Sequence, residues 1–206
     1  MDSIDSVTLE VADPEAAARF YSSAFALDPS LVRVRGSEAP TTGFRGFTLS
    51  LVASQPGNVD ALYTAALDAG ATSLKPAAKS LWGYGGVVQA PDGTVWQLAT
   101  SAKKDSAPAA RAFDEIVLLL GVADVRAAKR FYAERGLAVA KSFGGKYVEF
   151  ATGPGGVKLS LYKRRGLAKV AGVAAEGSGS HRLVICGGDR PFTDPDGFAW
   201  EPAPTA

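Results

Sequence analysis

The 206-residue sequence offers few side chains for metal or covalent chemistry. Its one histidine, His181, and its one cysteine, Cys186, both lie in the short stretch HRLVIC. The site of two histidines and one carboxylate that serves iron oxygenases cannot be built within one subunit from a single histidine. Cys186 has no second cysteine for a disulfide. We expect it to be a small core residue rather than a reactive thiol.

Aromatic and polar side chains that suit a small organic ligand are more numerous. Trp82 and Tyr84 stand among glycines in KSLWGYGG, which predicts a flexible loop beside a sheet. Ligand sites are concave and mostly apolar, with few polar groups. The ligand-binding residues that these patterns predict are Trp82, Tyr84, Trp96, Gln97, Tyr147, Glu149 and Tyr162. For the aromatic members, burial in the core is the alternative.

The composition indicates a globular protein with a buried core. Hydrophobic residues make up 47% of the chain, and 22 basic residues face 21 acidic ones. Such a balance gives nucleic acid or an anionic membrane no overall attraction. The N-terminus has no basic segment followed by an apolar one, and no apolar run is long enough to span a membrane. We therefore expect a cytoplasmic protein without nucleic-acid or membrane partners.

One segment of the sequence occurs twice. ADPEAAARFY, residues 12–21, returns as ADVRAAKRFY, residues 123–132, and each copy follows a strand-like run, SVTLEV or EIVLLLGV. Asp13 and Asp124 stand where a helix N-cap belongs, and Pro14 suits a first helical position. The spacing predicts two strand–helix units whose apolar faces pack against sheets. The predicted faces comprise Ala17, Phe20, Tyr21, Ala24 and Phe25 in the first helix, and Ala128, Phe131 and Tyr132 in the second.

A second repeated feature ends each half of the chain. APDGTVWQL, residues 90–98, matches DPDGFAWEP, residues 194–202, and Pro-Asp-Gly predicts a tight turn before a strand. The two halves therefore comprise residues 1–100 and 113–206. Residues 101–112, SAKKDSAPAARA, have the composition of a linker.

Between these landmarks the halves differ. In the first, GFTLSLVA predicts a strand and NVDALYTAALDAG a helix with Asn58 as its cap and an apolar face that includes Tyr63 and Leu67. In the second, LAVAKSF, KYVEFAT and VKLSLYK predict an antiparallel meander. No helix equivalent to that of Asn58 is predicted there. The basic residues 163–169 are expected to be a solvated charge run, with contact to an anionic ligand as the alternative.

These paired motifs resemble the vicinal oxygen chelate superfamily, which contains glyoxalase I, bleomycin-resistance proteins and extradiol dioxygenases. The resemblance rests on VTLEVADPEAAARFY, GVADVRAAKRFYAERGLAV and the two Pro-Asp-Gly strand ends, and it covers nearly the whole chain. It implies an α+β fold of paired βαβββ modules, in which curled mixed sheets cup a small ligand and the two halves are pseudo-repeats.

The resemblance also implies where a divalent metal would be bound, at the first and last strands of each module. In the first half these positions hold Ser6, Thr48 and Gln97, so we expect no metal there. In the second half Glu201 stands where the carboxylate ligand would stand, and His181 where a ligand histidine often stands. Glu115 could replace the ligand histidine of the first strand, but Val117 aligns with that position equally well.

Two functions are compatible with the resemblance, because this fold hosts both. We favour a protein of the glyoxalase and bleomycin-resistance kind that binds a small organic ligand in an aromatic-lined cup without a tightly bound metal. The alternative is a metal-dependent lyase, isomerase or dioxygenase that uses His181 and Glu201, with Glu115 or Gln97 as proton acceptor. A third candidate function is an interaction module that uses the same sheet. We assign no cofactor. A bound divalent metal and a homodimer are both compatible with the sequence.

Overall fold

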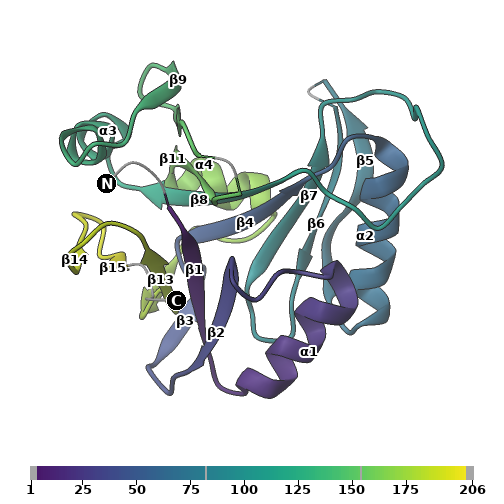
Figure 1. Cartoon of the computed structure of the whole chain (residues 1–206), viewed down its shortest axis with the longest axis horizontal. Coiled ribbons are helices and arrows are strands. Elements are labelled where there is room, and N and C mark those ends of the chain that lie inside the picture. Colours follow the sequence, from purple (N-terminus) through teal and green to yellow (C-terminus); the bar gives the residue numbers. More distant parts are fainter. Residues whose placement is uncertain (1–3, 82, 154, 203–206) are drawn as a thin grey trace.

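The computed structural model describes residues 4–81, 83–153 and 155–202 and shows an α+β fold (Figure 1). Strand β1 (Ser6–Val11) leads into helix α1 (Pro14–Phe25), and β8 (Glu115–Val122) leads into α3 (Val125–Glu134). Both copies of the repeated segment therefore form the predicted strand–helix unit. Asp13 accepts a hydrogen bond from the Ala16 amide, and Asp124 accepts bonds from the first amides of α3, so both predicted N-caps are confirmed.

The larger sheet joins two βαβββ modules. The first module supplies β4 (Phe47–Val52), β5 (Thr72–Ser80), β6 (Gly83–Gln89) and β7 (Val95–Thr100), with α2 (Pro56–Asp68) after its first strand. The second supplies β8, β9 (Val139–Phe143), β10 (Tyr147–Phe150) and β11 (Lys158–Lys163). The strand order is β5-β6-β7-β4-β8-β11-β10-β9. Strands β4 and β8 pair antiparallel at the centre, while β4–β7 and β8–β11 pair parallel on either side. The two modules are therefore related by a pseudo-twofold axis. Figure 1 shows α2 and β5 at one end of the fold and α3 and β9 at the other.

The second sheet has the order β14-β15-β13-β1-β2. It combines β1 and β2 (Val32–Gly36) with β13 (Leu183–Cys186), β14 (Phe192–Thr193) and β15 (Ala199–Glu201). The short strands β3 (Thr41–Gly43) and β12 (Gly177–Gly179) pair with each other. Both large sheets thus take strands from both halves of the chain, and the pseudo-repeats are interleaved rather than separate. The predicted meander of β9, β10 and β11 is confirmed by their antiparallel pairing.

Within each half, the two repeated motifs pack against each other. The Tyr21 ring lies 5.5 Å from the Trp96 ring, and the Tyr21 hydroxyl donates to Asp92 at 2.6 Å. In the second half Tyr132 lies 5.5 Å from Trp200 and donates to Asp194 at 2.5 Å. The helix entrance and the Pro-Asp-Gly strand end therefore form one packing unit, which is built twice.

The predicted helix faces are mostly, but not entirely, confirmed. All five residues predicted for α1 are buried, and so are Ala128 and Tyr132 in α3. Phe131 is only partly buried, which corrects our prediction. Its ring packs against Phe192 and lies 3.5 Å from the Arg135 guanidinium, so it covers the rim of the core rather than its interior.

The start of α2 differs from the prediction. The helix begins at Pro56 with Gln55 at the N-cap position, and Asn58 lies inside the first turn. The preference of proline for the first helical position explains this start. Gln55 and Asn58 instead anchor the linker: the Ser106 amide donates to Gln55 Oε1 at 2.8 Å and the Ala110 amide to Asn58 Oδ1 at 2.9 Å. On the predicted apolar face, Leu67 is 37% exposed and Tyr63 is partly buried, whereas Val59, Leu62 and Ala66 are buried.

A helix is present in the second half where none was predicted. Helix α4 (Arg164–Ala171) occupies the basic stretch that we expected to be a solvated charge run. Its charges and Gly166 obscured a narrow apolar face of Leu167, Ala168 and Ala171, which are all buried. Gly172, with φ of 78°, ends the helix in the left-handed region. Across the described residues, no helix is both long and apolar enough to cross a membrane.

Candidate functional site

The large sheet has one face toward the main core and another that we call the inner face. Side chains alternate between the two faces of a strand. In β4, Leu49 and Leu51 belong to the main core, whereas in β8 Val117 and Leu119 belong to a smaller cluster on the inner face. Alternation places Thr48, Gln97, Glu149, Ser160 and Tyr162 on the inner face as well.

Helix α4 packs on the middle of the inner face, where the resemblance implied a ligand. It contacts β8, β11, β4 and β7. Leu167 and Ala168 share a cluster with Val117 and Leu119, and Ala171 shares one with Val87 and Val95. A Cβ atom at Gly121 would lie only 3.0 Å from the Arg164 Cα atom, which shows how closely the helix approaches β8. The chain therefore covers the centre of its own cup.

Gln97 and Thr48, two positions where the resemblance implied metal ligands, are bonded to each other. The Gln97 amide donates to the Thr48 hydroxyl at 2.7 Å, and Thr48 is fully buried. Ser6 lies buried on β1 in the other sheet, so the three first-half positions do not share one sheet.

Three of the predicted ligand-binding residues lie together on the arm of β10 and β11. The rings of Tyr147 and Tyr162 are 5.0 Å apart, and the Tyr147 hydroxyl donates to Glu149 at 2.8 Å. Burial raises the pKa of both tyrosines. Glu149 also forms ion pairs with Lys141 and Lys158. These polar groups satisfy one another and form a compact patch at one side of α4.

Trp96 and Tyr84, also predicted as ligand contacts, lie on the other face of the sheet. Trp96 is fully buried and packs on Tyr21 and Phe25, so it is a core residue on the face opposite Gln97. Tyr84 donates to Asp60 of α2 at 2.7 Å, on the helix side of the sheet. The hydrogen bond to Asp60 is the main cause that raises the Tyr84 pKa to about 12. Trp82 lies outside the described residues. Neither Trp96 nor Tyr84 faces a cup.

The second-half metal candidates are engaged separately, so the residues do not fit a metal site. Both ring nitrogens of His181 face backbone carbonyls, Nδ1 that of Arg45 at 2.5 Å and Nε2 that of Asp196 at 3.1 Å. Glu115 pairs with Lys158 at 2.7 Å at the start of β8. Across the described residues, no three His, Cys, Asp or Glu side chains come together in a way that could hold a metal ion.

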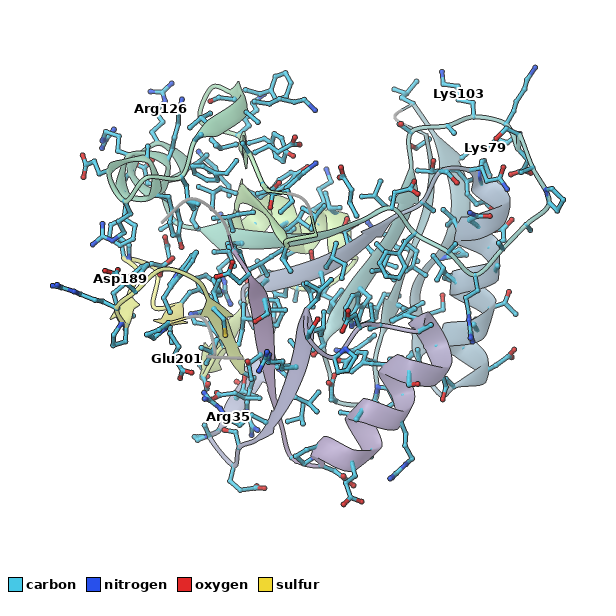
Figure 2. All side chains as sticks on the ribbon, viewed as in Figure 1. Arg35, Lys79, Lys103, Arg126, Asp189 and Glu201 are labelled. Carbon is cyan, nitrogen blue, oxygen red and sulfur yellow. The ribbon has the colours of Figure 1, made fainter. Side chains whose placement is uncertain are left out.

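Glu201, the third candidate for a metal ligand, forms an ion pair with Arg35 instead. Arg35 lies 3.2 Å from Glu201 and 2.8 Å from Glu10, and Figure 2 labels Arg35 and Glu201 close together at the smaller sheet. The hydrogen bond to Glu10 is the main cause that raises the Arg35 pKa. Because Arg35 and Glu201 are each nearly half exposed, the pair stabilises the fold by at most about 1 kcal/mol.

Two pockets lie side by side around Arg45. The first has a volume of about 300 Å³ and lies between the β3–β4 connection, the first Pro-Asp-Gly turn and the residues after α4. It is lined by Gly43, Phe44, Arg45, Phe47, Gln89, Gly93, Thr94, Val95, Val173, Ala174 and Glu176. The second has a volume of about 270 Å³ and lies against the start of α1. It is lined by Val11, Ala12, Asp13, Ala16, Ala17, Phe20, Arg45, Pro91, Asp92 and Arg182.

Arg45 divides the two pockets and is held by the turn. Its Nη2 atom donates to the Asp92 carbonyl at 2.6 Å. Gly93 has a φ of 87°, a left-handed conformation that favours glycine, and a Cβ atom there would lie 2.8 Å from Nη2. His181 has the equivalent place in the second half, because its Nε2 atom faces the Asp196 carbonyl and lies above Gly197.

Comparisons with known proteins identify the fold. No protein-family model matches the sequence, and no curated protein matches it. Glyoxalase I from Zea mays aligns with a TM-score of 0.63 at 14% identity, over 96% of this chain and 90% of its own. A putative dioxygenase from Bacillus subtilis aligns with a TM-score of 0.56 at 12% identity, over 94% of this chain and 71% of its own. The chain has the vicinal oxygen chelate fold. The fold that the paired motifs implied is therefore confirmed, and identities this low show the fold alone.

Arg45 and Arg182, which line the second pocket, are not singled out by any motif in the sequence. Burial is the main cause that lowers the Arg45 pKa; the nearby positive charge of Arg182 lowers it further, and Asp92 opposes the shift. No periodic pattern marks either arginine, because both lie in irregular segments, Arg45 before β4 and Arg182 before β13. The Pro-Asp-Gly turn was the available signal, since both pockets are built on it.

Proposed function

We propose that the protein binds a small organic ligand in the first pocket, beside Arg45, and needs no tightly held metal to do so. The first pocket supports this proposal. Its walls include Phe44, Phe47, Val95 and Val173, with a few polar groups among them, which is the usual composition of a ligand site. At about 300 Å³ it suits a small molecule.

Polar groups in this pocket are available to orient a ligand. The Thr94 hydroxyl is buried beside the Tyr21 phenol, whose pKa it lowers, so it is not a free group of the pocket. Gln89 uses its Nε2 atom on the Gly93 carbonyl at 3.1 Å, which leaves its carbonyl oxygen as an acceptor. Glu176 lies exposed at the edge.

The proposed activity is binding by burial, of the ligand-sequestering kind, and no catalytic residue is assigned. The metal-dependent alternative draws no support from His181 or Glu201, whose polar atoms have other partners. The patch of Tyr147, Glu149 and Tyr162 lies on the other arm of the sheet and is a secondary candidate for ligand contact.

The test is a binding screen of small aromatic and aliphatic compounds by ligand-observed NMR, with and without a metal chelator. We expect hits whose affinity the chelator leaves unchanged. Ala174→Trp, at the exposed edge of the first pocket, should block binding, because the indole would fill the cavity. Val170→Trp, at an exposed position on α4, is the matched control and should bind normally. Loss of binding on chelation, or full binding by Ala174→Trp, would contradict the proposal.

A further inference from the structure

The second pocket has two arginines in its wall, and each leaves part of its guanidinium unused. Arg45 Nη1 and Arg182 Nε are buried and have no hydrogen-bond partner among the described residues. Each side chain is anchored by another nitrogen: Arg45 Nη2 donates to the Asp92 carbonyl, and Arg182 Nη1 donates to the Ser37 carbonyl. Both guanidiniums are therefore held in place in the wall of the pocket, and each keeps one nitrogen that no described residue uses.

The carboxylates of this pocket form no direct ion pair with the arginines, although the negative charge of Asp92 acts on Arg45. Asp92 accepts from the Tyr21 hydroxyl at 2.6 Å and from the Thr94 amide at 2.7 Å, so each of its carboxylate oxygens already has a donor. Asp13 is exposed and caps α1 through the Ala16 amide at 2.9 Å. Among the described residues, no salt bridge within 4 Å reaches Arg45 or Arg182.

The backbone of Arg182 has an uncommon conformation. Its φ of 53° is in the left-handed region, which glycine adopts without the steric penalty of a Cβ atom. Strained residues of this kind often cluster where a side chain has a function. Here the conformation directs an arginine to the Ser37 carbonyl and the wall of the second pocket.

We propose that the second pocket binds the carboxylate of a small organic acid between Arg45 and Arg182. Guanidinium groups match carboxylates in geometry and charge. The apolar part of the acid would lie against Ala16, Ala17 and Phe20, which also line this pocket. This inference goes beyond the proposed function, because it assigns a ligand to the second pocket rather than to the first. An inorganic anion would leave that apolar wall uncovered, so an organic acid fits the pocket better.

The test compares benzoate, benzamide and inorganic phosphate by NMR titration of the ¹⁵N-labelled protein. Benzoate and benzamide have nearly the same shape and differ in charge. We expect benzoate to bind about tenfold more tightly than benzamide, as a charge-assisted pair would require. Benzoate should also shift the Arg182 Nε–H signal and the amides of residues 13–17. Equal affinity for benzamide, or phosphate binding as tight as benzoate, would overturn the inference.

Two variants test whether Arg182 causes the preference for benzoate over benzamide. Arg182→Gly should fold, because glycine tolerates the left-handed backbone, and should lose the preference for benzoate over benzamide. Arg130→Gln, at an exposed position on α3, is the control and should retain that preference. An undiminished preference in Arg182→Gly would refute the inference while leaving the proposed function intact. If neither compound bound and the screen found no hits, the proposed function itself would fail.

Discussion

Trp96→Ala should lower the free energy of unfolding by about 3–5 kcal/mol, as is usual when a fully buried aromatic residue is truncated. The Trp96 ring has no exposed surface and contacts Tyr21 and Phe25 of α1. Its removal would leave a cavity at the contact between the repeated helix and the Pro-Asp-Gly strand. Urea unfolding followed by circular dichroism measures the effect.

Tyr84→Ala is the matched control for this prediction, because both residues were predicted from the sequence as ligand contacts. Tyr84 lies on the helix side of the sheet and makes one exposed hydrogen bond to Asp60, so its loss should cost about 1 kcal/mol or less. If Trp96→Ala kept the stability of the parent and lost only ligand binding, Trp96 would belong to the site rather than to the core.

The protein should lose stability steeply above pH 10. Burial is the main cause that raises the pKa values of Tyr21 and Tyr132 well above 10, and the negative charges of Asp92 and Asp194 raise them further. In the unfolded chain both phenols ionise near pH 10. The native state then binds more protons than the unfolded state, so stability is fully present below pH 10 and declines as the pH rises above it. Each tyrosine contributes up to about 1.4 kcal/mol per pH unit.

Urea unfolding at pH 8 and pH 11 measures this dependence. Other groups also titrate in this range, so the comparison is with the double variant Tyr21→Phe and Tyr132→Phe. The variant should be less stable than the parent at pH 8, because two buried hydrogen bonds are lost, and its stability should fall less between the two pH values. An equal fall in both proteins would mean that the two phenols ionise freely in the native state.

The fold could be predicted from the sequence because its strongest signals are local and occur twice. The two helix entrances carry their own caps, and the faces of α1 and α3 repeat with helical spacing. Helix α4 was missed because its apolar face has only Leu167, Ala168 and Ala171 within a basic, glycine-containing stretch. The start of α2 was misplaced because Asn58 looked like a cap, although Pro56 and the linker determine its environment.

The site was harder to predict because it depends on strand parity and on long-range contacts. Trp96 and Gln97 are neighbours in sequence and face opposite sides of β7, so the same motif contributes one core residue and one inner-face residue. Arg35 and Glu201 meet across the smaller sheet, at a sequence separation of 166 residues, and no local pattern indicates that this carboxylate already has a cation. Arg45 and Arg182 come together only when the two halves interleave.

A crystal structure of the protein soaked with a set of small aromatic fragments and with zinc and manganese salts would show where a ligand binds and whether a metal does. We expect fragment density in the pockets beside Arg45, α4 still packed on the inner face, and His181 and Glu201 with their present partners. A metal ion bound to His181 and Glu201, or a fragment seated on the inner face with α4 displaced, would contradict this expectation.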